Sequence, residues 1–483
     1  MSPPSFLALD LGAGSGRAIV GSLTEGRFAL KEVHRFPNTM VRLPDGLHWN
    51  TLSLFENCLA GVRAARAETE NLVSLGIDTW GVDYALLGDG DRLLGVPYAY
   101  RDSRTEGLYE SWSLEQRELI YRETGIQFMP FNTLVQLKAE SSARPHLWDE
   151  AKSFLSTPDL LNFWLTGVKK AEFSMATTSQ MLDPASRTWS KPVLEFLGAK
   201  PDLFAEIAMP GTVLGRANIQ QGGHMEETDI QVILPGCHDT ASAEAAVPAL
   251  GDDHVWISTG TWSIMGMTLA SPIRTPEAMA ANMTNEGAVD GRIRFCRNIT
   301  GLWLVQECMR EWGISIAEAA ELAENCPCPG SWVNSTDTCF LMPNSMPQMI
   351  QSWCQATGQR VPAGKAEILR CAYESIAMGH ARCLAAISAL TGRTPRTIHL
   401  MGGGSQSRLL CQLTADMTGL PVVAGPVEAT SLGNIAVQMV SMGMIGSLSE
   451  AREIIAQSGL TQEFKPKPDR DWADVINKLP KTR

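Results

Sequence analysis

The hydrophobic pattern of the chain predicts strands and helices that alternate along most of its length. The first apolar run, residues 6–20 (FLALDLGAGSGRAIV), places a glycine-rich turn between two runs of apolar and partly β-branched residues. Because such residues favour strands, we expect strand, tight turn and strand here rather than strand and helix. Residues 28–36 predict a third strand, and residues 52–68 carry apolar side chains at helical spacing.

The same alternation continues to the end of the chain and predicts an α/β fold. Residues 101–210 are mixed and helical, which is typical of material inserted around a substrate site, and the charged tail after Gln462 is expected to be peripheral. A glycine turn at residues 402–404 lies between a predicted strand and a predicted helix. The other predicted elements are strands at 72–77 and 397–401 and helices at 240–247, 366–390 and 408–417.

The opening hairpin has a partial repeat at residues 255–267 (VWISTGTWSIMGM). Glycines in such turns let backbone N–H groups approach a phosphate closely. A dinucleotide fingerprint has the spacing G-x-G-x-x-G and opens a helix, and residues 12–16 have neither property. For either copy alone, an ordinary glycine-rich hairpin is the alternative. When Gly12 is placed on Gly260, the aligned pairs are Asp10 with Ser258 and Ser15 with Ser263.

The length of 483 residues exceeds what one hydrophobic core usually supports, so two large domains are expected. We place the boundary so that residues 1–248 form the first domain and residues 249–483 the second. With 44% hydrophobic and 19% charged residues the composition is that of a globular protein. No apolar run approaches the roughly 20 residues of a membrane helix, and no signal peptide is recognisable, so a cytoplasmic location is expected.

The net charge of −12 disfavours nucleic acid as a partner but is compatible with a small anion held by backbone amides. The eleven cysteines are scattered without zinc-ligand spacing and are interpreted as reduced, mostly buried thiols. Cys354 and Cys371 could pair on oxidation, which is disfavoured in a cytoplasm. The motifs G-x-x-x-x-G-K-[ST], G-x-S-x-G, H-E-x-x-H and H-R-D are absent, which excludes the commonest NTPase, hydrolase, metalloprotease and protein-kinase readings.

The opening Asp-x-Gly hairpin and its partial repeat are accompanied by the turn His238-Asp239-Thr240 and by the glycine-rich stretch at residues 402–438. Together these features resemble the FGGY family of sugar kinases, within the actin-like ATPases. The resemblance implies two actin-like domains with a ribonuclease-H-like core, each a mixed sheet flanked by helices, and a cleft between them. Within the family the segments are most similar to kinases that phosphorylate the ketose L-rhamnulose on O1. No Phe-Gly-Gly-Tyr occurs in the chain, and Gly14 stands where such kinases often carry Ser. The segments that resemble these L-rhamnulose kinases most specifically are 77–87 (IDTWGVDYALL), 100–105 (YRDSRT), 125–134 (GIQFMPFNTL), 238–243 (HDTASA) and 281–287 (ANMTNEG).

The resemblance implies a kinase that uses ATP and Mg²⁺. Phosphoryl transfer needs donors around the phosphates, a carboxylate for the metal and a base at the acceptor hydroxyl. Asp10 is expected to position Mg²⁺ through water, since hard cations prefer oxygen ligands; a plain turn acceptor is its alternative role. The residues implied to bind ATP are Ala13, Gly14, Ser15, Gly16, Arg17, Thr261, Gln306 and Gly403, with Arg17 adding a permanent positive charge.

From the residues alone, three of these positions also have ordinary interpretations. A Thr in a strand is unremarkable at Thr261, an exposed helical Gln is a common residue at Gln306, and Gly403 suits the entry turn of a helix.

Asp239 is the candidate general base that takes the proton from the attacking sugar hydroxyl. An Asp just before a helix is also a favoured N-cap, and the two roles are compatible. For the sugar, Gly81 would allow close backbone approach, Asp83 would accept hydroxyl protons, and Trp80 would pack against the ring or methyl group. Asn298, just before a helix, resembles a substrate contact or a cap. The resemblance adds the neighbours of Asp239, His238 and Thr240, to the sugar-binding residues.

Two other functions remain open at this point. One is a kinase for another ketose, such as L-fuculose or xylulose. The other is a non-catalytic, actin-like ATP-binding regulator, which would keep both phosphate hairpins but would need no base at Asp239. The expected partners are a ketose and ATP, without nucleic acid or membrane, and the expected assembly is a monomer or homodimer.

Overall fold

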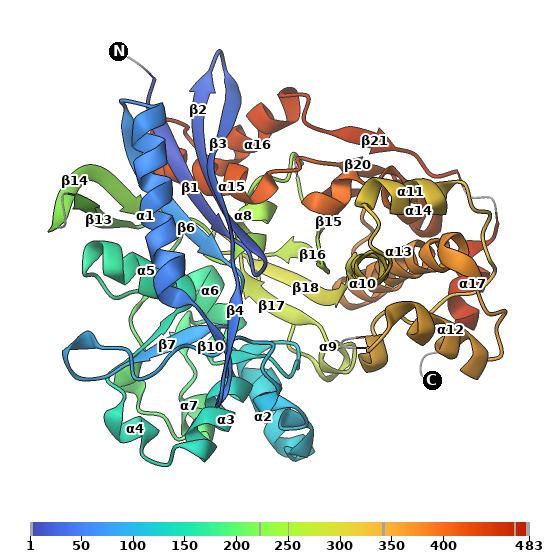
Figure 1. Ribbon diagram of the computed structural model, residues 1–483, viewed down its shortest axis with the longest axis horizontal. Helices are drawn as coiled ribbons and strands as arrows, with labels where there is room; N and C mark the ends of the chain where they lie inside the picture. Colours follow the sequence, from blue (N-terminus) through green and yellow to red (C-terminus); the bar gives the residue numbers. More distant parts are fainter. Residues whose placement is uncertain (1–2, 222–223, 250, 341–342, 468–469, 480–483) are drawn as a thin grey trace. The chain divides into compact units, whose positions relative to one another are not determined.

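The computed structural model describes residues 3–221, 224–249, 251–340, 343–467 and 470–479, and the chain forms two compact units (Figure 1). The first unit comprises Met1–Leu250, Thr268–Phe295 and Ala429–Gly459, and the second comprises Gly251–Met267, Cys296–Glu428 and Leu460–Arg483. Both units combine helices with a mixed sheet, which confirms the predicted α/β class. Each unit combines several separate segments of the chain. The predicted single boundary between residues 248 and 249 therefore describes something different, and it stays a prediction.

The sheet of the first unit contains the opening hairpin. β1 runs antiparallel to β2 and parallel to β6, so the sheet is mixed, and the predicted hairpin and third strand are confirmed. Every residue of β1 is buried, as expected for a strand inside the sheet. In sheet order the strands are β13 (Val213–Gln221), β14 (His224–Ile233), β6 (Leu72–Thr79), β1 (Ser5–Leu11), β2 (Ser15–Thr24) and β3 (Arg27–Pro37).

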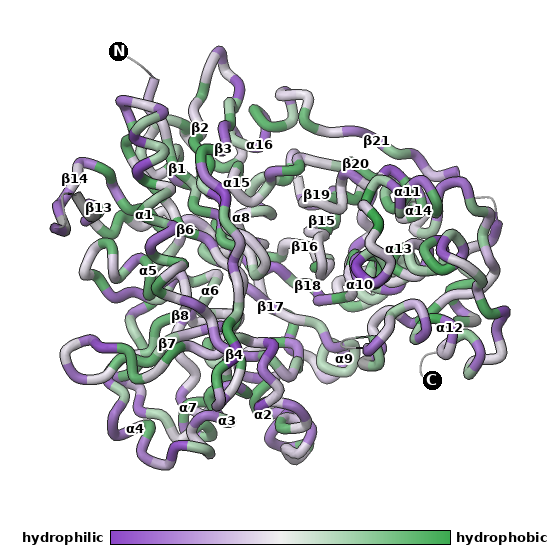
Figure 2. The backbone as a smooth tube through the Cα atoms, viewed as in Figure 1, coloured by the Kyte–Doolittle hydropathy of each residue, from purple (hydrophilic) through white to green (hydrophobic). Residues whose placement is uncertain are grey.

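Helices cover both faces of this sheet. Alternate residues of β1, such as Leu7 and Leu9, share one apolar cluster with α1 (Thr51–Glu68) and α5 (Thr157–Thr166). Hydrophobic and hydrophilic residues alternate along α1 in Figure 2, as expected for a helix with one buried face. The opposite face carries α15 (Ala429–Ser441), which also packs against α8 (Asp239–Ala245).

The approach of α15 is close because two strand positions lack side chains. A Cβ at Gly21 would lie 2.5 Å from the Ile435 side chain, and one at Gly76 would lie 2.6 Å from Asn434 Oδ1. A segment near the end of the chain is therefore part of the first unit.

The rest of the first unit consists of short helices and strand pairs, as predicted for residues 101–210. The strand pairs are β4 (Met40–Leu43) with β5 (Gly46–Trp49), β7 (Tyr84–Leu87) with β8 (Ser153–Ser156), β9 (Ala171–Glu172) with β12 (Ile207–Ala208), and β10 (Leu182–Asp183) with β11 (Thr188–Trp189). The other elements are α2 (Leu114–Thr124), α3 (Thr133–Ala143), α4 (Leu147–Glu150), α6 (Phe173–Thr178), α7 (Lys191–Leu197), α9 (Pro276–Ala280), β17 (Thr284–Gly287) and α16 (Leu448–Gln457).

The second unit holds the repeated hairpin, β15 and β16, in its own mixed sheet. β15 runs antiparallel to β16 and parallel to β19, and β20 runs antiparallel to β21. The strands follow the order β18 (Ile293–Thr300), β16 (Trp262–Leu269), β15 (His254–Thr259), β19 (Thr397–Met401), β20 (Val422–Ala424) and β21 (Gln462–Phe464). The helices are α10 (Trp303–Trp312), α11 (Ile316–Glu324), α12 (Met346–Ala356), α13 (Gly364–Thr391), α14 (Arg408–Thr418) and α17 (Trp472–Lys478).

The tail of the chain differs from the prediction. Phe464 on β21 is 6% exposed and Trp472 on α17 is 4% exposed, and Trp472 belongs to the main hydrophobic core of the second unit. The expectation of a peripheral tail was therefore wrong, because two aromatic residues among the many charged ones of the tail are buried.

The eleven cysteines, all within the described ranges, are free thiols, and most of them are buried. A hydrogen bond donated by the buried Cys371 thiol to Cys354, together with burial, raises the pKa of Cys371. Within the described part of the chain, no helix has both the length and the apolar character needed to cross a bilayer.

Candidate active site

Asp10 lies at the end of β1, where three strands bring charged side chains together. In the sheet register it pairs with Arg17 on β2 and with Asp78 on β6. Asp10 is 6% exposed, and Arg17 Nη2 donates a hydrogen bond of 2.5 Å to its Oδ2. This partly buried ion pair fixes the direction of the Asp10 carboxylate and balances its charge.

The turn after Asp10 is braced from one side by Asn38. The Gly12 N–H bonds the Ser15 carbonyl at 3.0 Å and closes the turn. Asn38 donates from its backbone to the Gly14 carbonyl at 3.2 Å and from its side chain to the Gly12 carbonyl at 3.0 Å. Gly14 is exposed, with open space around the position of a Cβ. Hydrogen bonds thus close the turn on one side while Gly14 stays accessible, and its contact with phosphate stays a prediction.

Asp78 adds a second, deeper carboxyl group beside Asp10. It is fully buried, and Asn434 Nδ2 on α15 donates to its Oδ2 at 2.5 Å. Dehydration and the neighbouring Asp10 charge raise the pKa of Asp78 well above its ordinary range. Among the groups that the structure describes, its Oδ1 has no hydrogen-bond partner.

Asp239 is presented by a turn that runs along the end of β6. The Thr79 N–H bonds the Cys237 carbonyl at 2.8 Å, and Thr79 also pairs with His238 in a parallel bridge. α8 begins at Asp239, with His238 at the cap position and no side-chain cap, so Asp239 does not serve as the N-cap. Its side chain is 31% exposed and accepts a bond from Thr240 Oγ1 at 3.1 Å.

The surroundings make the Asp239 carboxylate more basic. Dehydration is the largest cause of its raised pKa, His238 opposes it, and the Asp10 charge adds to it. A carboxylate with a raised pKa and a partly open side chain is suited to accept a proton.

The ring of His238 joins Asp239 to a buried ion pair. His238 Nε2 lies 3.6 Å from Asp239 Oδ1, and Nδ1 lies 3.2 Å from Glu286 Oε2. Arg294, fully buried, places Nη2 3.1 Å from that Glu286 oxygen and donates to the Gly287 carbonyl. Dehydration opposes the shift, but the His238 hydrogen bond and the Arg294 charge together lower the pKa of Glu286.

Gly81 and His238 are neighbours. A Cβ at Gly81 would lie 3.3 Å from His238 Nε2, which is closer than most Cβ contacts. The absence of a side chain at Gly81 therefore makes room for the imidazole ring, and its close approach to the sugar stays a prediction.

Asp83 gathers aromatic side chains around one carboxyl group. Its Oδ2 accepts from Trp49 Nε1 at 2.6 Å, from Trp80 Nε1 at 2.8 Å and from the Tyr100 N–H at 3.2 Å. Gln136 Nε2 donates to its Oδ1 at 2.9 Å. Asp83 is 1% exposed, and dehydration raises its pKa against these hydrogen bonds. The carboxyl group thus orients Trp80, and its predicted direct contact with sugar stays a prediction.

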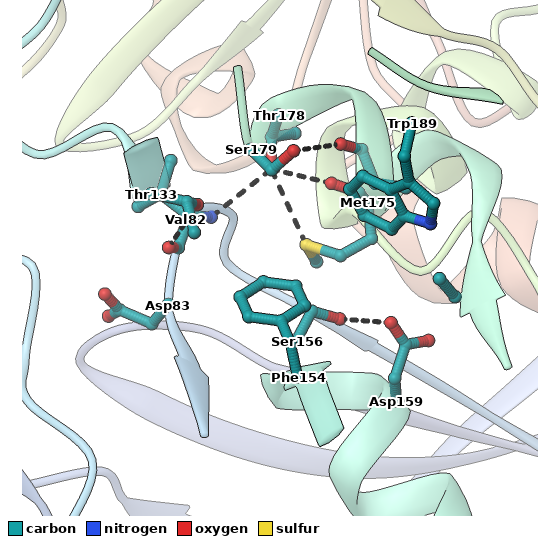
Figure 3. Close-up of a pocket in the computed structure, with 12 residues that line it drawn as sticks. Val82, Asp83, Thr133, Phe154, Ser156, Asp159, Met175, Thr178, Ser179 and Trp189 are labelled. Carbon is teal, nitrogen blue, oxygen red and sulfur yellow. Dashed lines mark hydrogen bonds between the residues drawn. The ribbon is translucent and has the colours of Figure 1, made fainter. Parts of the chain in front are cut away.

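Val82, between Gly81 and Asp83, has a backbone conformation that sequence analysis did not foresee. Its φ is 71°, which is strained for a β-branched residue. Its carbonyl accepts from Thr133 Oγ1 at 2.6 Å, and its N–H bonds Thr178 Oγ1 at 3.4 Å. Figure 3 shows Val82 and Asp83 beside a small cavity, with Thr133 and Thr178 pointing toward the Val82 backbone. Strain held in this way marks functional segments in many proteins.

In the second unit, two predicted ATP-binding residues contact each other. Thr261 Oγ1 donates to Gln306 Oε1 at 3.0 Å, so Gln306 is a half-buried partner of the hairpin rather than an exposed helical residue. The Leu302 N–H bonds the Gly260 carbonyl at 2.8 Å and ties the hairpin turn to the start of α10.

The glycine turn at residues 402–404 packs on the same hairpin. A Cβ at Gly404 would lie 2.1 Å from Thr259 Cγ2, so only glycine fits there. Gly403 itself is exposed, with open space beside it. The turn thus packs on the hairpin and is still accessible at Gly403, whose contact with ATP stays a prediction.

Asn298 is not placed as predicted. It lies inside β18, and the next helix, α10, begins only at Trp303. The helix-cap alternative for Asn298 was therefore wrong.

The structure brings the predicted residues together within each unit. The first unit groups the Asp10 hairpin, the residues 80–83 and the His238 turn at the ends of neighbouring strands, and the second groups Thr261 with Gln306. In the described residues, no set of three or more His, Cys, Asp or Glu side chains is arranged as a metal cage. Sequence analysis missed Ser431 and Asn434 on α15, Glu286 with Arg294, and Asn38, since their partners are distant in the sequence.

Comparison with known proteins gives the class. The pattern of the FGGY family of carbohydrate kinases matches twice, the N-terminal domain at residues 5–245 and the C-terminal domain at residues 255–442. The chain therefore belongs to the FGGY family of carbohydrate kinases, and it is a phosphotransferase that uses ATP. Solved structures agree with this fold: a gluconate kinase and a xylulose kinase, both from Lactobacillus acidophilus, have TM-scores of 0.80 and 0.79 at 16% identity and cover 99% of this chain and 96% of theirs.

Curated relatives are more similar in sequence. The rhamnulokinase of Bacteroides thetaiotaomicron is 38% identical over 470 residues, which are 97% of each chain. The rhamnulokinase of Halalkalibacterium halodurans is 40% identical over 458 residues, which are 94% of this chain and 97% of that one.

Proposed function

We propose that this kinase transfers the γ-phosphoryl group of ATP to O1 of L-rhamnulose, giving L-rhamnulose 1-phosphate and ADP. The substrate class is supported by the rhamnulokinases that match nearly the whole chain. The observation that carries the chemistry is Asp239, a partly open carboxylate of raised pKa at the start of α8. We place the reaction in the cytoplasm and the working protein as a monomer or homodimer.

Asp239 acts as the general base. A base must lie within hydrogen-bond reach of the hydroxyl whose proton it removes, and its basicity should approach the working pH. Dehydration raises the pKa of Asp239 in that direction. Its carboxylate takes the O1 proton while O1 attacks the γ-phosphorus. Thr240 Oγ1 donates a hydrogen bond to Asp239 Oδ1, and this bond fixes the orientation of the carboxylate.

The hairpin at residues 13–17 holds phosphate oxygens through its backbone, with Arg17 as the cation. In the second unit, Thr261, Gln306 and Gly403 are assigned to ATP. Asp10 suits an Mg²⁺ held through water, because a carboxylate already bonded to Arg17 and Ser431 keeps lone pairs for a water but little freedom to move. When bound, Mg²⁺ neutralises charge on the phosphates.

The sugar is assigned to Trp80, Gly81, Asp83, His238 and Thr240 in the first unit and to Asn298. A 6-deoxy ketose has hydroxyls on most carbons and a methyl group at its end. The indole of Trp80, fixed by Asp83, supplies an apolar wall, and the His238 ring supplies a polar contact beside Asp239.

The test is ADP release by the full chain with ATP, Mg²⁺ and one sugar at a time, using L-rhamnulose, L-fuculose and D-xylulose. We expect kcat/KM for L-rhamnulose to exceed the others by at least about tenfold, and ³¹P–¹H coupling to place the phosphate on C1. A preference for another sugar would overturn the substrate assignment. ADP release that no sugar stimulates would favour an ATP-binding regulator instead.

A further inference from the structure

The Glu172 carboxylate is buried at the start of α6, a helix that sequence analysis did not single out. Glu172 is 0% exposed. Its Oε1 accepts from the Ser174 N–H at 2.8 Å, and its Oε2 accepts from Ser174 Oγ at 2.6 Å and from the Met175 N–H at 2.9 Å. These bonds cap the first turn of α6.

The same carboxylate reaches the turn that carries Asp239. The Cys237 N–H donates to Glu172 Oε2 at 3.2 Å, and the His238 N–H donates to Ser174 Oγ at 3.2 Å. Two successive N–H groups before Asp239 are therefore held by one capping unit, Glu172 with Ser174. On the other side, the Cys237 carbonyl is held by the Thr79 N–H.

The length of the Glu side chain explains its place here. Ser, Thr, Asp and Asn, whose side chains are shorter than that of Glu, are the preferred N-caps. Glu172 caps α6 and still reaches Cys237. Four donors point at the carboxyl group, which suits an ionised, acceptor-only carboxylate. Dehydration raises its pKa, and the hydrogen bonds from Ser174, Met175 and Cys237 oppose that shift.

α6 also contacts the other segments around Asp239. Thr177 Oγ1 accepts from the Gly287 N–H at 2.8 Å, and Thr178 Oγ1 lies 3.4 Å from the Val82 N–H. Every residue of the helix is buried. One buried helix, α6, therefore contacts the turn before Asp239, the strained Val82 and β17.

We propose that Glu172 is a positioning residue that holds the Cys237–His238 peptide groups so that Asp239 faces the sugar hydroxyl. The inference rests on the proposed role of Asp239 as the base. Because proton transfer requires a separation near 3 Å, a small tilt of the turn lowers turnover while ATP binding in the hairpins is unaffected.

The decisive variant is Glu172→Asp. A shorter carboxylate still caps α6, since Asp is a favoured N-cap, but it no longer reaches Cys237. We expect kcat to fall about tenfold with KM for ATP close to wild type, and the melting temperature to fall by only a few degrees because the buried Cys237 N–H loses its acceptor. Glu172→Gln, which exchanges an acceptor oxygen for a donor, should lower kcat at least as much. A wild-type kcat for Glu172→Asp would show that the residue only caps α6 and would overturn the proposal.

A second background separates this inference from the proposed function. If Glu172 acts through Asp239, adding Glu172→Asp to Asp239→Asn should lower kcat by less than about twofold. A further tenfold loss would mean that Glu172 acts independently of the base and would overturn the positioning role. If Asp239→Asn alone keeps full turnover, the general-base assignment fails, whatever Glu172 does.

Matched controls cover the loss of a buried group as such. Glu140→Gln removes the charge of another buried carboxylate in the first unit. Glu140 is bonded to Tyr84 and Arg144 and not to the turn that carries Asp239. Ser174→Ala removes the bond to His238 without changing charge and is paired with Ser190→Ala, a buried cap of α7. We expect Ser174→Ala to lower kcat and the two controls to leave it unchanged; equal kcat in all three would contradict the proposal.

Discussion

The Ser431 hydroxyl donates a hydrogen bond of 3.1 Å to Asp10 Oδ2, although 421 residues separate the two. The helix that carries Ser431 also donates from Asn434 to Asp78, so one polar side of α15 orients both carboxyl groups. The acidic end of β1 is thus completed by a segment from the other end of the chain.

Replacing Ser431 by Ala should therefore weaken the response to Mg²⁺. Loss of one hydrogen bond to a carboxylate costs about 1 kcal/mol, which corresponds to about a fivefold higher Mg²⁺ concentration at half-maximal rate. Initial rates across an Mg²⁺ titration measure this. Ser441→Ala, at the end of the same helix and bonded to the Gly211 carbonyl, is the control. An identical Mg²⁺ dependence in the two variants would refute the link between Ser431 and the metal.

Replacing Asp239 by Asn should remove the base while keeping its size. We expect kcat to fall on the order of a hundredfold or more, because a general base commonly contributes that much. ATP affinity, measured by titration calorimetry, should stay nearly intact, since the hairpins are untouched. Unchanged turnover would remove Asp239 from the mechanism.

The periodic elements could be predicted because burial repeats at a fixed spacing. The helix expected at 366–390 is α13 (Gly364–Thr391), and the strand expected at 397–401 is β19 at the same residues. Turn length has no such period. Leu11 pairs with Gly16, but Thr259 pairs with Ser263, so the second hairpin is one residue shorter. In strand register Ser15 therefore corresponds to Trp262, and its alignment with Ser263 was wrong.

Long-range contacts at the site could not be predicted for a different reason. A hydrophobic pattern shows which face of a helix is buried but not which strand it meets. Ser431 and Asn434 lie on a helix of mostly small and apolar residues, and nothing local indicates that their partners are Asp10 and Asp78. Glu172 likewise resembles any surface acid until α6 and the Cys237 turn are folded together.

Thr261 and Gln306 should behave as one unit in ATP binding. Their hydrogen bond of 3.0 Å orients both side chains, so either substitution by Ala loses the same contact. We expect each to raise KM for ATP about fivefold, and the double variant to be little worse than either one. Thr391→Ala, which removes a hydroxyl bonded within α13, is the control in the same unit. Additive effects of the two substitutions would show that Thr261 and Gln306 act separately.

Asp159 should make the stability of the protein depend on pH. It is 3% exposed beside the cavity in Figure 3, and dehydration, aided by the charge of Glu172, raises its pKa from 3.8 to about 8. The folded state therefore keeps a proton that the unfolded state releases above pH 4. The unfolding free energy falls with rising pH wherever the folded state binds more protons than the unfolded state. Asp159 therefore destabilises the fold increasingly as pH rises from about 4 to about 8.

Asp159→Asn should remove that dependence, because the amide resembles the protonated acid and can still bond Ser156 and the Glu172 N–H. Relative to wild type, the variant should gain about 1.4 kcal/mol of unfolding free energy for each pH unit between 5 and 7. Urea unfolding at pH 5, 6 and 7 measures the difference, and Asp202→Asn on the surface should change nothing. A constant difference between Asp159→Asn and wild type across this range would mean that Asp159 is already ionised in the folded protein.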